Sequence, residues 1–465
     1  MKKHILILIF FLTSMSSQAS IKGLLNEFLE KNYLLKSNKL SVDESAQEFN
    51  ALWASKTYFL NFSAGFNTTP SRSANREASD FEAGDFNNYN LSLNKTFNWG
   101  GEFSFNNRFN ALKQINMFTQ DISYSQNMGR DFLGKSFKLE LAMANINKEK
   151  TEVIVKGANQ ALLQKFYMTF ISAKFHRTMV NLQTEAKKRA VKRKDNIVKR
   201  VEAGILEKVD AYRAEIAVMA KEEDIKSARF SLNENLQEVS AGVHRKIQES
   251  EVPYFSLRKV VLPGEVKGDL ESNFKVSEKK KEIKFIKENL KKIKRSFLPD
   301  INIRLSYKTE GSGFEVTDTL GEGNLGQGGK LAGSISLVIP LGYEQNKVDQ
   351  ASKRIALNRQ QYQMKNLRSE LDNMESGLKD RVEMVRKNIE SATKRRRISA
   401  KTLEEQNRLY LKGRAPLDTV VIAEEQLILN EMRLAQFLLQ LEQILVSQSI
   451  IYGDLENYLV SRGNN

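Results

Sequence analysis

Residues 299–307 read PDINIRLSY, and this stretch decides the fold because apolar and polar residues alternate along it. Period two with one apolar side is the pattern of a half-buried strand. A charged helical segment precedes the stretch, and a Gly-rich segment separates it from a second alternating strand at 334–341. A long helical run follows, broken once at residues 410–413, which read YLKG.

The N-terminal half of the chain follows the same course. Alternating strands at 60–66 and 122–128 precede a helical run that is broken at Gly204. Gly134 and Gly204 lie 70 positions apart, and Gly342 and Gly413 lie 71 positions apart. A unit that occurs twice predicts two helical hairpins of equal reach, each following strands. An arm of this size would be on the order of 100 Å long at 1.5 Å per residue.

The first half holds more strands than the second. Further alternation at 89–93 and 103–105, on either side of a tight turn at 99–101, predicts four strands there against two in the second half. The extra hairpin departs from strict duplication and leaves the strand number of the chain open.

The chain divides into four segments. We expect a signal peptide at 1–19, a first repeat at 20–252, a linker at 253–269 and a second repeat at 270–465. The first repeat has a leading helix from Ile21 to about Ser55, strands at about 57–128 and a hairpin tip near 204. The second has a helix, strands at about 299–341 and a tip near 413. The linker is identified by its Pro and Gly residues.

The N-terminus predicts export. A basic start, an apolar stretch at 4–15 and small residues before position 20 are typical of a cleaved secretory signal. The chain has no Cys, which excludes disulfides, thiolate metal sites and a thiol-linked lipid anchor. Past the signal we find no apolar stretch that approaches the length of a transmembrane helix.

The net charge of +16 needs an explanation. Its basic residues cluster on helical segments at 187–194, 279–284 and 394–397, without an aromatic platform beside them. We therefore interpret them as solvated helix faces and expect no nucleic acid partner. Such faces could also bias an enclosed channel toward anions.

Nothing in the sequence predicts catalysis. The three His residues are His4 in the signal and His176 and His244, which are isolated on helices without ligand spacing. The glycines at 321–329 lie between two strands, so we expect a flexible loop on the outer face of a barrel rather than a phosphate cradle. We expect no enzyme activity, no catalytic or metal-binding residues and no cofactor.

Alternating strands joined to very long helices predict a membrane conduit. Only helices or closed barrels can cross hydrocarbon, because an unpaired backbone group is costly there. Four to six strands cannot close a barrel, so their edges are expected to meet other copies of the chain. Pro299 begins one strand, and Pro340 with Gly342 ends the next and allows the bend into a helix.

Apolar seams follow each hairpin tip. Val209, Tyr212, Ile216 and Met219 are spaced three, four and three, as in a coiled coil. In the second half leucines recur at heptad spacing, at 427, 434 and 441. We expect these seams to pair neighbouring helices into a hollow cylinder.

At this point the chain resembles the TolC-like outer membrane efflux proteins over essentially its whole mature length. Four features carry the resemblance: the leading helix ending in LNEFLEKN at 25–32, FLPD at 297–300 before a strand, SLVIPL at 336–341, and the two tip turns. It implies a mainly helical chain with a membrane β-barrel, in which three copies share the barrel and a coiled-coil helical tunnel.

The resemblance also implies roles at the tip. Gly204 with Asp210, and Tyr410 and Gly413 with Asp418, match the helix-turn-helix tip where family members narrow and bind adaptors. On this analogy Tyr410 and Arg414 are gating partners. Gly204 precedes Asp210 by six positions but Gly413 precedes Asp418 by five, so we expect one turn to be shorter.

Two further departures concern other positions. Val421 stands where some members carry a second acid, so we expect weaker cation preference than in acidic relatives. Tyr58 stands in the first copy where the second has Pro299.

The function implied is an outer membrane channel-tunnel that gives efflux or secreted substrates passive exit. Its partners would be two further copies in a homotrimer, a periplasmic adaptor, a proton-driven or ATP-driven inner-membrane pump and outer membrane lipid. The alternative is a periplasmic coiled-coil scaffold or adhesin stalk without a pore. The substrate stays open between drugs, metals and proteins.

Overall fold

The computed structural model describes residues 21–67, 86–112, 115–325, 328–339 and 341–462. The expected signal peptide at 1–19 and Pro340 lie outside these residues. The chain forms two compact units, each assembled from separate stretches of sequence. We call them the helical unit (Met1–Lys39, Ile154–Ser277 and Asn366–Asn465) and the sheet unit (Leu40–Val153 and Glu278–Lys365).

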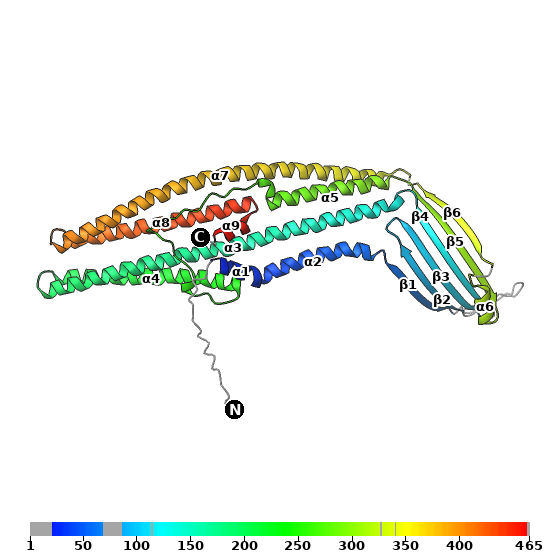
Figure 1. The fold of residues 1–465 in the computed structure, drawn as a ribbon, viewed down its shortest axis with the longest axis horizontal. Helices are drawn as coiled ribbons and strands as arrows, with labels where there is room; N and C mark the ends of the chain where they lie inside the picture. The colour runs from blue at the N-terminus through cyan, green and yellow to red at the C-terminus, as the bar shows by residue number, and fades with distance from the viewer. Residues whose placement is uncertain (1–20, 68–85, 113–114, 326–327, 340, 463–465) are drawn as a thin grey trace, which may run out of the picture. The chain divides into compact units, whose positions relative to one another are not determined.

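The first half of the chain contains helices α1 (Ile21–Lys31), α2 (Tyr33–Ala54), α3 (Lys135–Glu202) and α4 (Lys208–Val243), strands β1 (Tyr58–Asn67), β2 (Phe86–Thr96), β3 (Gly101–Leu112) and β4 (Asn116–Asn127), and short 3-10 helices η1 (Phe132–Gly134) and η2 (Glu249–Glu251). The second half contains η3 (Leu270–Ser272), α5 (Phe274–Ser296), β5 (Asp300–Gly313), α6 (Val316–Glu322), β6 (Lys330–Val338), α7 (Glu344–Leu411), α8 (Leu417–Ile451) and α9 (Leu455–Arg462). Figure 1 labels the α-helices and the strands. Helices α3 and α7 have 68 residues each, so the arms are of equal length, as the glycine spacing predicted.

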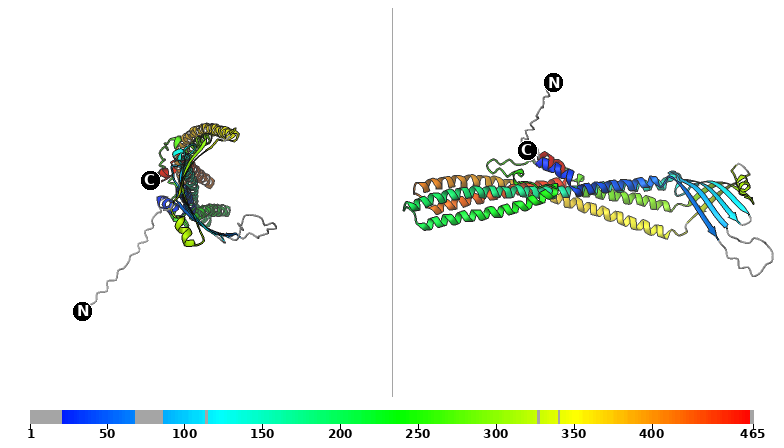
Figure 2. Two further views of the ribbon diagram at one scale, coloured as in Figure 1. Left: turned by 90° about the vertical axis from the view of Figure 1, so that its right-hand side faces the viewer. Right: turned by 90° about the horizontal axis from the view of Figure 1, so that it is seen from below.

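The sheet unit is built on six antiparallel strands in sequential order, β1 to β6. Four come from the first half and two from the second, which confirms the uneven division. The strands have 9 to 14 residues, enough for the nine to eleven or so that a tilted membrane strand needs. They run obliquely to the helices of this unit that join them (Figure 2).

Every junction between a strand and a long helix lies at one end of the sheet. The chain passes from α2 into β1, from β4 toward α3, from α5 into β5 and from β6 into α7 at this end (Figure 1). We call it the helical end of the sheet. At the other end of the sheet β1, β3 and β5 end and β2, β4 and β6 begin.

The segment between β5 and β6 differs from the expected loop. Residues 316–322 form helix α6, and Gly323 follows as its C-cap. The Thr309 hydroxyl of β5 donates to the Gly323 carbonyl at 2.6 Å, and an added Cβ at Gly323 would meet Phe118 of β4. The start of the Gly-rich stretch is thus ordered and lies against the sheet.

The helical unit has α8 at the centre of its core. One buried cluster includes Phe28 and Phe166, whose rings stack at 4.2 Å, together with Val239 of α4 and Val446 of α8. In a second cluster the leucines of α8, including Leu441, pack against apolar residues of α7. Near the end of α8 the buried Tyr452 hydroxyl donates to Glu375 of α7 at 2.6 Å; burial and this carboxylate raise the pKa of Tyr452 to about 12.

The predicted leading helix is broken. Helix α1 ends at Lys31 and α2 begins at Tyr33, because the Asn32 side chain caps a new helix. Its Oδ1 accepts hydrogen bonds from the backbone N–H groups of Leu34 and Leu35, at 3.0 and 3.3 Å. This is the role that Asn favours at a helix N-terminus.

The expectation that no helix past the signal is apolar enough to span a membrane was wrong for α8. By length and composition it passes such a test, although half of its most apolar 18-residue window is buried inside the protein. The apolar residues serve the core of the helical unit, which explains the composition.

Candidate pore wall and tip turns

One face of the sheet is mainly apolar across all six strands, although Lys95, Asn107 and Gln120 also lie on it. The register aligns one row of large side chains from edge to edge: Leu60, Leu93, Phe105, Ile122, Tyr307 and Leu331. The next row toward the helical end begins with Tyr58 and continues through Lys95, Phe103, Tyr124 and Leu305. A broad apolar surface of this kind needs a partner other than water.

The opposite face is mainly polar, with apolar exceptions that include Phe59, Met117 and Val338. Its central row runs Asn61, Ser92, Asn106, Asp121, Lys308 and Lys330. The Arg304 guanidinium donates to the Ser123 hydroxyl at 3.1 Å on this same face. Alternation between a lipid-compatible face and a water-compatible face is the signature of a membrane barrel strand.

Both outer strands of the sheet have a free edge. Within the described residues β1 pairs only with β2, and β6 pairs only with β5. Unpaired backbone donors and acceptors along a strand are a template for another strand. Six strands are also fewer than the eight of small closed barrels.

The strand-to-helix junctions hold the residues that the sequence singled out. Pro299 directly precedes β5, and its carbonyl accepts a hydrogen bond from the Arg130 N–H at 3.2 Å. Gly342 has a φ of +94° and Tyr343 one of +54° between β6 and α7. The Tyr343 ring stacks on Phe297 with centroids 5.4 Å apart. The bend expected at Gly342 is therefore present.

The two tip turns share one backbone design. Gly204 and Gly413 have φ values of +73° and +70°, the left-handed conformation that glycine adopts without strain. Each glycine N–H bonds to the carbonyl three residues back at 2.9 Å, and the next N–H reaches five residues back, at 2.8 Å for Ile205 and 2.9 Å for Arg414. This pair of bonds is the Schellman motif that ends a helix.

The expectation that one turn is shorter was wrong. Five residues, 203–207, separate α3 from α4, and five residues, 412–416, separate α7 from α8. The spacing differed because the acids occupy different positions in the new helix: Asp210 is the third residue of α4 and Asp418 the second of α8. Either position places a carboxylate near the positive end of a helix. Pro416 is the N-cap of α8.

Tyr410 is buried at the end of α7. It is 9% exposed and packs with Leu403, Val420 and Leu427 between α7 and α8. The Arg200 guanidinium of α3 lies 5.2 Å from its ring centroid, a cation–π arrangement. Its hydroxyl has no hydrogen-bond partner among the residues that the structure describes, and Arg414 is exposed, so the structure does not pair the two. Asp210 is half-buried and Asp418 is exposed.

Part of the basic runs is not solvated, contrary to the sequence interpretation. Arg189 and Arg193 of α3 reach the Glu424 carboxylate of α8 at 2.7 and 2.5 Å, and the Glu424 side chain is buried. Arg396 of α7 pairs with the buried Glu431 of α8 at 3.2 Å. These pairs tie α8 to both long helices. No sequence signal identified them, because each pair joins residues far apart in the chain.

The two predicted seams behave differently. Leu427, Leu434 and Leu441 of α8 are buried within the chain. The α4 seam, which consists of Val209, Tyr212, Ile216 and Met219, is exposed. Helix α4 instead buries another stripe, including Ala214 and Val218. The α4 seam thus has no partner within the described chain.

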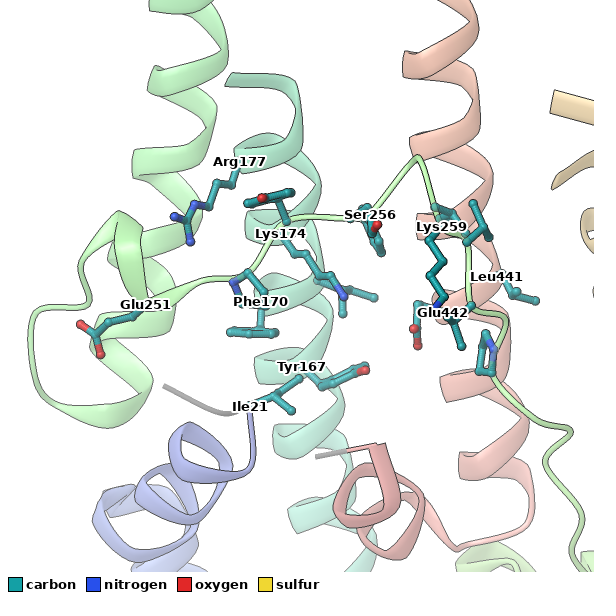
Figure 3. Close-up of a pocket in the computed structure, with 18 of the residues that line it drawn as sticks. Ile21, Tyr167, Phe170, Lys174, Arg177, Glu251, Ser256, Lys259, Leu441 and Glu442 are labelled. Atoms are coloured by element: carbon teal, nitrogen blue, oxygen red, sulfur yellow. The ribbon is translucent and has the colours of Figure 1, made fainter. Parts of the chain in front are cut away.

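A hollow of about 730 Å³ lies in the helical unit between α3, α8 and the segment after α4 (Figure 3). Lys174 lies 4.6 Å over the Phe255 ring, and Arg177 donates to the Ser250 carbonyl at 3.2 Å. The Phe255 N–H donates to the buried Thr178 hydroxyl at 2.9 Å. These contacts hold the connecting segment against α3. Within the described residues no group of three His, Cys, Asp or Glu could hold a metal ion.

Solved structures with this fold are outer membrane channels. The Neisseria gonorrhoeae MtrE outer membrane channel, in its open state, is 15% identical, with a TM-score of 0.69 over 94% of this chain and 90% of that one. The Vibrio cholerae outer membrane protein VceC is 13% identical, with a TM-score of 0.67 over 94% and 97%. The Campylobacter jejuni CmeC outer membrane channel is 10% identical, with a TM-score of 0.66 over 96% and 89%.

No protein-family model matches the chain, and no curated protein matches it by sequence. The likeness therefore rests on structure. It shows that the chain has the fold of the TolC-like outer membrane channels along nearly its whole length, as its sequence motifs implied.

Proposed function

We propose that this protein is an outer membrane channel-tunnel that gives substrates passive exit from the periplasm. Three copies would each contribute six strands to one shared barrel, with the apolar face toward lipid and the polar face toward a water-filled lumen. The helical arms would continue the conduit in the periplasm. The fold shared with known outer membrane channels supports this proposal.

The single observation that carries the proposal is the two-faced sheet with two free edges. A soluble sheet would cover its large apolar face with helices or a second sheet. A barrel shared between chains satisfies the apolar face with lipid and both edges with neighbouring strands.

The exposed α4 seam of the helical unit supports the same assembly. Its spacing of three, four and three suits knobs-into-holes packing on a helix of a neighbouring chain. The match of the two 68-residue helices and the two five-residue turns supports a duplicated chain whose tips lie at a common level.

We further propose that the tip turns dock a periplasmic adaptor, through which an inner-membrane pump drives export. Gly204, Asp210, Gly413, Arg414 and Asp418 would form the docking surface. Both Schellman turns present exposed backbone in a fixed shape, and the orphan Tyr410 hydroxyl lies beside them. In this proposal Tyr410 acts in the gate through Arg200, with which it is in contact.

Planar-bilayer recording tests the conduit. Purified protein should give stable, water-filled single channels. A Tyr410→Ala/Asp210→Ala double variant should conduct more, because it removes the Tyr410–Arg200 contact and one tip carboxylate. A matched control is Asn233→Ala, at an exposed position of α4 away from the tip. Protein that inserts but never conducts would refute the channel, whereas unchanged conductance in the double variant would refute only the gate.

The second candidate is a periplasmic coiled-coil scaffold or adhesin stalk without a pore. The long helices alone are compatible with it, but the apolar face of the sheet is not. Cell fractionation separates the two functions. A channel is expected in the outer membrane as an oligomer that resists mild detergent, and a scaffold is expected in the soluble periplasm.

Ion selectivity tests the charge of the lumen. The central polar row carries Lys308 and Lys330 against Asp121. With Val421 in place of a second tip acid, we expect a weak cation preference. A strong cation preference in bilayer reversal potentials would contradict this expectation.

A further inference from the structure

Five cationic side chains gather at the helical end of the sheet. Lys135 and Lys138 of α3 and Lys291, Lys294 and Arg295 of α5 surround a hollow of about 460 Å³, together with Leu139. We call these five residues the basic collar. All belong to the sheet unit.

The collar lies where strands give way to helices. Strand β4 ends at Asn127 and α3 begins at Lys135, while α5 ends at Ser296 and β5 begins at Asp300. The same end of the sheet is rich in aromatic residues. Trp99 stacks on Phe97 in the turn between β2 and β3, with centroids 4.3 Å apart. Aromatic and basic side chains together are typical of a membrane–water interface.

Only Lys291 of the five cations has a carboxylate partner in the described chain, and Arg295 is held by a backbone carbonyl. Lys291 pairs with Glu288 at 2.7 Å, and Arg295 donates two hydrogen bonds to the Arg130 carbonyl, at 2.8 and 3.2 Å. No ion pair joins Lys135, Lys138 or Lys294 to an acid among residues 21–462 as described.

The nearby carboxylates already have partners. Glu140 pairs with Lys292 at 2.8 Å, and Asp131 accepts the Ser136 N–H at 2.7 Å. The first turn of α3 carries Lys135 and Lys138 and no acid. Cations at the positive end of a helix are unfavourable, and an anion bound between them would relieve this. The collar therefore has unsatisfied positive charge in a concave setting.

Apolar side chains flank the collar in sequence. Leu133, two residues before Lys135, is 49% exposed, and Leu298, three residues after Arg295, is 43% exposed. A site that joins cations to exposed aliphatic side chains fits a ligand with an anionic head and a hydrocarbon tail. A free phosphate would make no contact with the leucines, and an acidic protein surface would leave them exposed to water.

We propose that the basic collar binds the phosphate of an anionic phospholipid headgroup in the membrane leaflet next to the helical end of the sheet. This rests on the proposed function, which places the sheet in a membrane. Lys135, Lys138 and Lys294 surround the phosphate, and the acyl chains lie along Leu133, Leu298 and the apolar face of the sheet. Basic pockets at such interfaces recognise anionic headgroups through direct charge pairing.

Native mass spectrometry of the detergent-solubilised oligomer tests the proposal. The protein is titrated with phosphatidylglycerol or with zwitterionic phosphatidylethanolamine of the same acyl chains. The wild type should retain phosphatidylglycerol at least about fivefold better, a difference of about 1 kcal/mol. The variant Lys135→Gln/Lys138→Gln/Lys294→Gln should lose this preference.

The matched control carries the same loss of charge elsewhere. Lys192→Gln/Lys267→Gln/Lys401→Gln removes three exposed lysines of the helical unit, and it should keep the preference for phosphatidylglycerol. Glycerol phosphate added at high concentration distinguishes the lipid from its headgroup alone. It should displace little of the bound phospholipid, because it lacks the acyl chains.

Each outcome decides the matter. Equal retention of the two lipids by the wild type, or an unchanged preference in the collar variant, would overturn the proposal. Loss of the preference in both triple variants would show a general charge effect and would also overturn it. Full displacement by glycerol phosphate would show an anion site that does not recognise lipid. Bilayer conductance of the same wild-type sample reports separately on the channel, so a conducting protein without lipid preference refutes the collar alone.

Discussion

Helices α4 and α8 both follow a tip turn of five residues, yet they meet their surroundings differently. The leucine seam of α8 is buried inside its own chain, and the α4 seam is exposed to solvent. The buried stripe of α4 lies on another face, including Ala214 and Val218. One hairpin is thus completed within the chain, and the other retains an exposed apolar seam. This difference supports the proposed assembly of several copies.

The largest effect on the stability of the chain is expected in α8. Leu441 is 1% exposed among other leucines, so Leu441→Ala should lower the free energy of unfolding by about 2–5 kcal/mol. Leu429→Ala on the exposed side of the same helix should cost well under half of that. Denaturant unfolding followed by circular dichroism measures both. Equal costs would contradict the assignment of the α8 seam to the core.

The buried carboxylate of α8 should rank second. Glu424→Gln removes the charge that Arg189 and Arg193 share, leaving two guanidinium groups without an ionic partner. We expect the free energy of unfolding to fall by about 2 kcal/mol. This is less than for a fully buried pair, because the Arg189 side chain is about one-third exposed. The exposed neighbour Glu425→Gln should change the free energy of unfolding by less than about 0.5 kcal/mol. If the Glu424 variant is as stable as this control, the ion pairs of Glu424 do not stabilise the fold.

The two tip glycines should be equivalent. Gly413→Ala forces a side chain into the left-handed conformation and should cost about 1–2 kcal/mol, and Gly204→Ala should cost about the same. An added Cβ would meet no other atom at either position, so backbone strain alone sets the cost. Gly377→Ala, inside α7 and with open space around its Cβ, is the control and should be neutral or stabilising. If the two substitutions lower the free energy of unfolding by clearly different amounts, the two tip turns are not equivalent.

The smallest effect on the single chain, and a large one on assembly, is expected in the α4 seam. Ile216 is 65% exposed, so Ile216→Glu should leave the helicity of the chain unchanged while it places a charge in the contact between chains. Asn233→Glu adds the same charge on another exposed face of α4. Light scattering of detergent-solubilised protein should show dissociation only for the Ile216 variant. If both variants remain fully assembled, the α4 seam is not an interface.

The comparison also explains how far the sequence could be interpreted. Alternation predicted the strands, and helical periodicity with glycine spacings of 70 and 71 predicted two equal arms, which have 68 residues each, and both tips. These signals are local. Which seam is buried is not local: the α4 and α8 stripes look alike until the packing is known. Arg189 could not be distinguished from Lys192 either, because its partner Glu424 lies 235 positions away. The lengths of the two turns were predicted wrongly, because Asp210 and Asp418 occupy different positions in the helices that follow the turns.

Other differences had a signal that the sequence did contain. Asn32 is a residue that caps helices, so the break between α1 and α2 was open to prediction. The orphan Tyr410 hydroxyl and its contact with Arg200 were not, since they depend on how three helices pack.

The central claim is that the free edges of the sheet meet those of neighbouring chains, and the absence of native cysteine allows it to be tested directly. Cysteines are placed in pairs on the polar face, at Asn61 or Ser63 of β1 and at Ser334 or Ser336 of β6, and oxidised in isolated outer membranes. We predict that at least one pair gives dimers and trimers on a denaturing gel that reducing agent reverses, while the single-cysteine variants remain monomers. Monomers alone from every pair, in protein that fractionates with the membrane, would contradict the shared barrel.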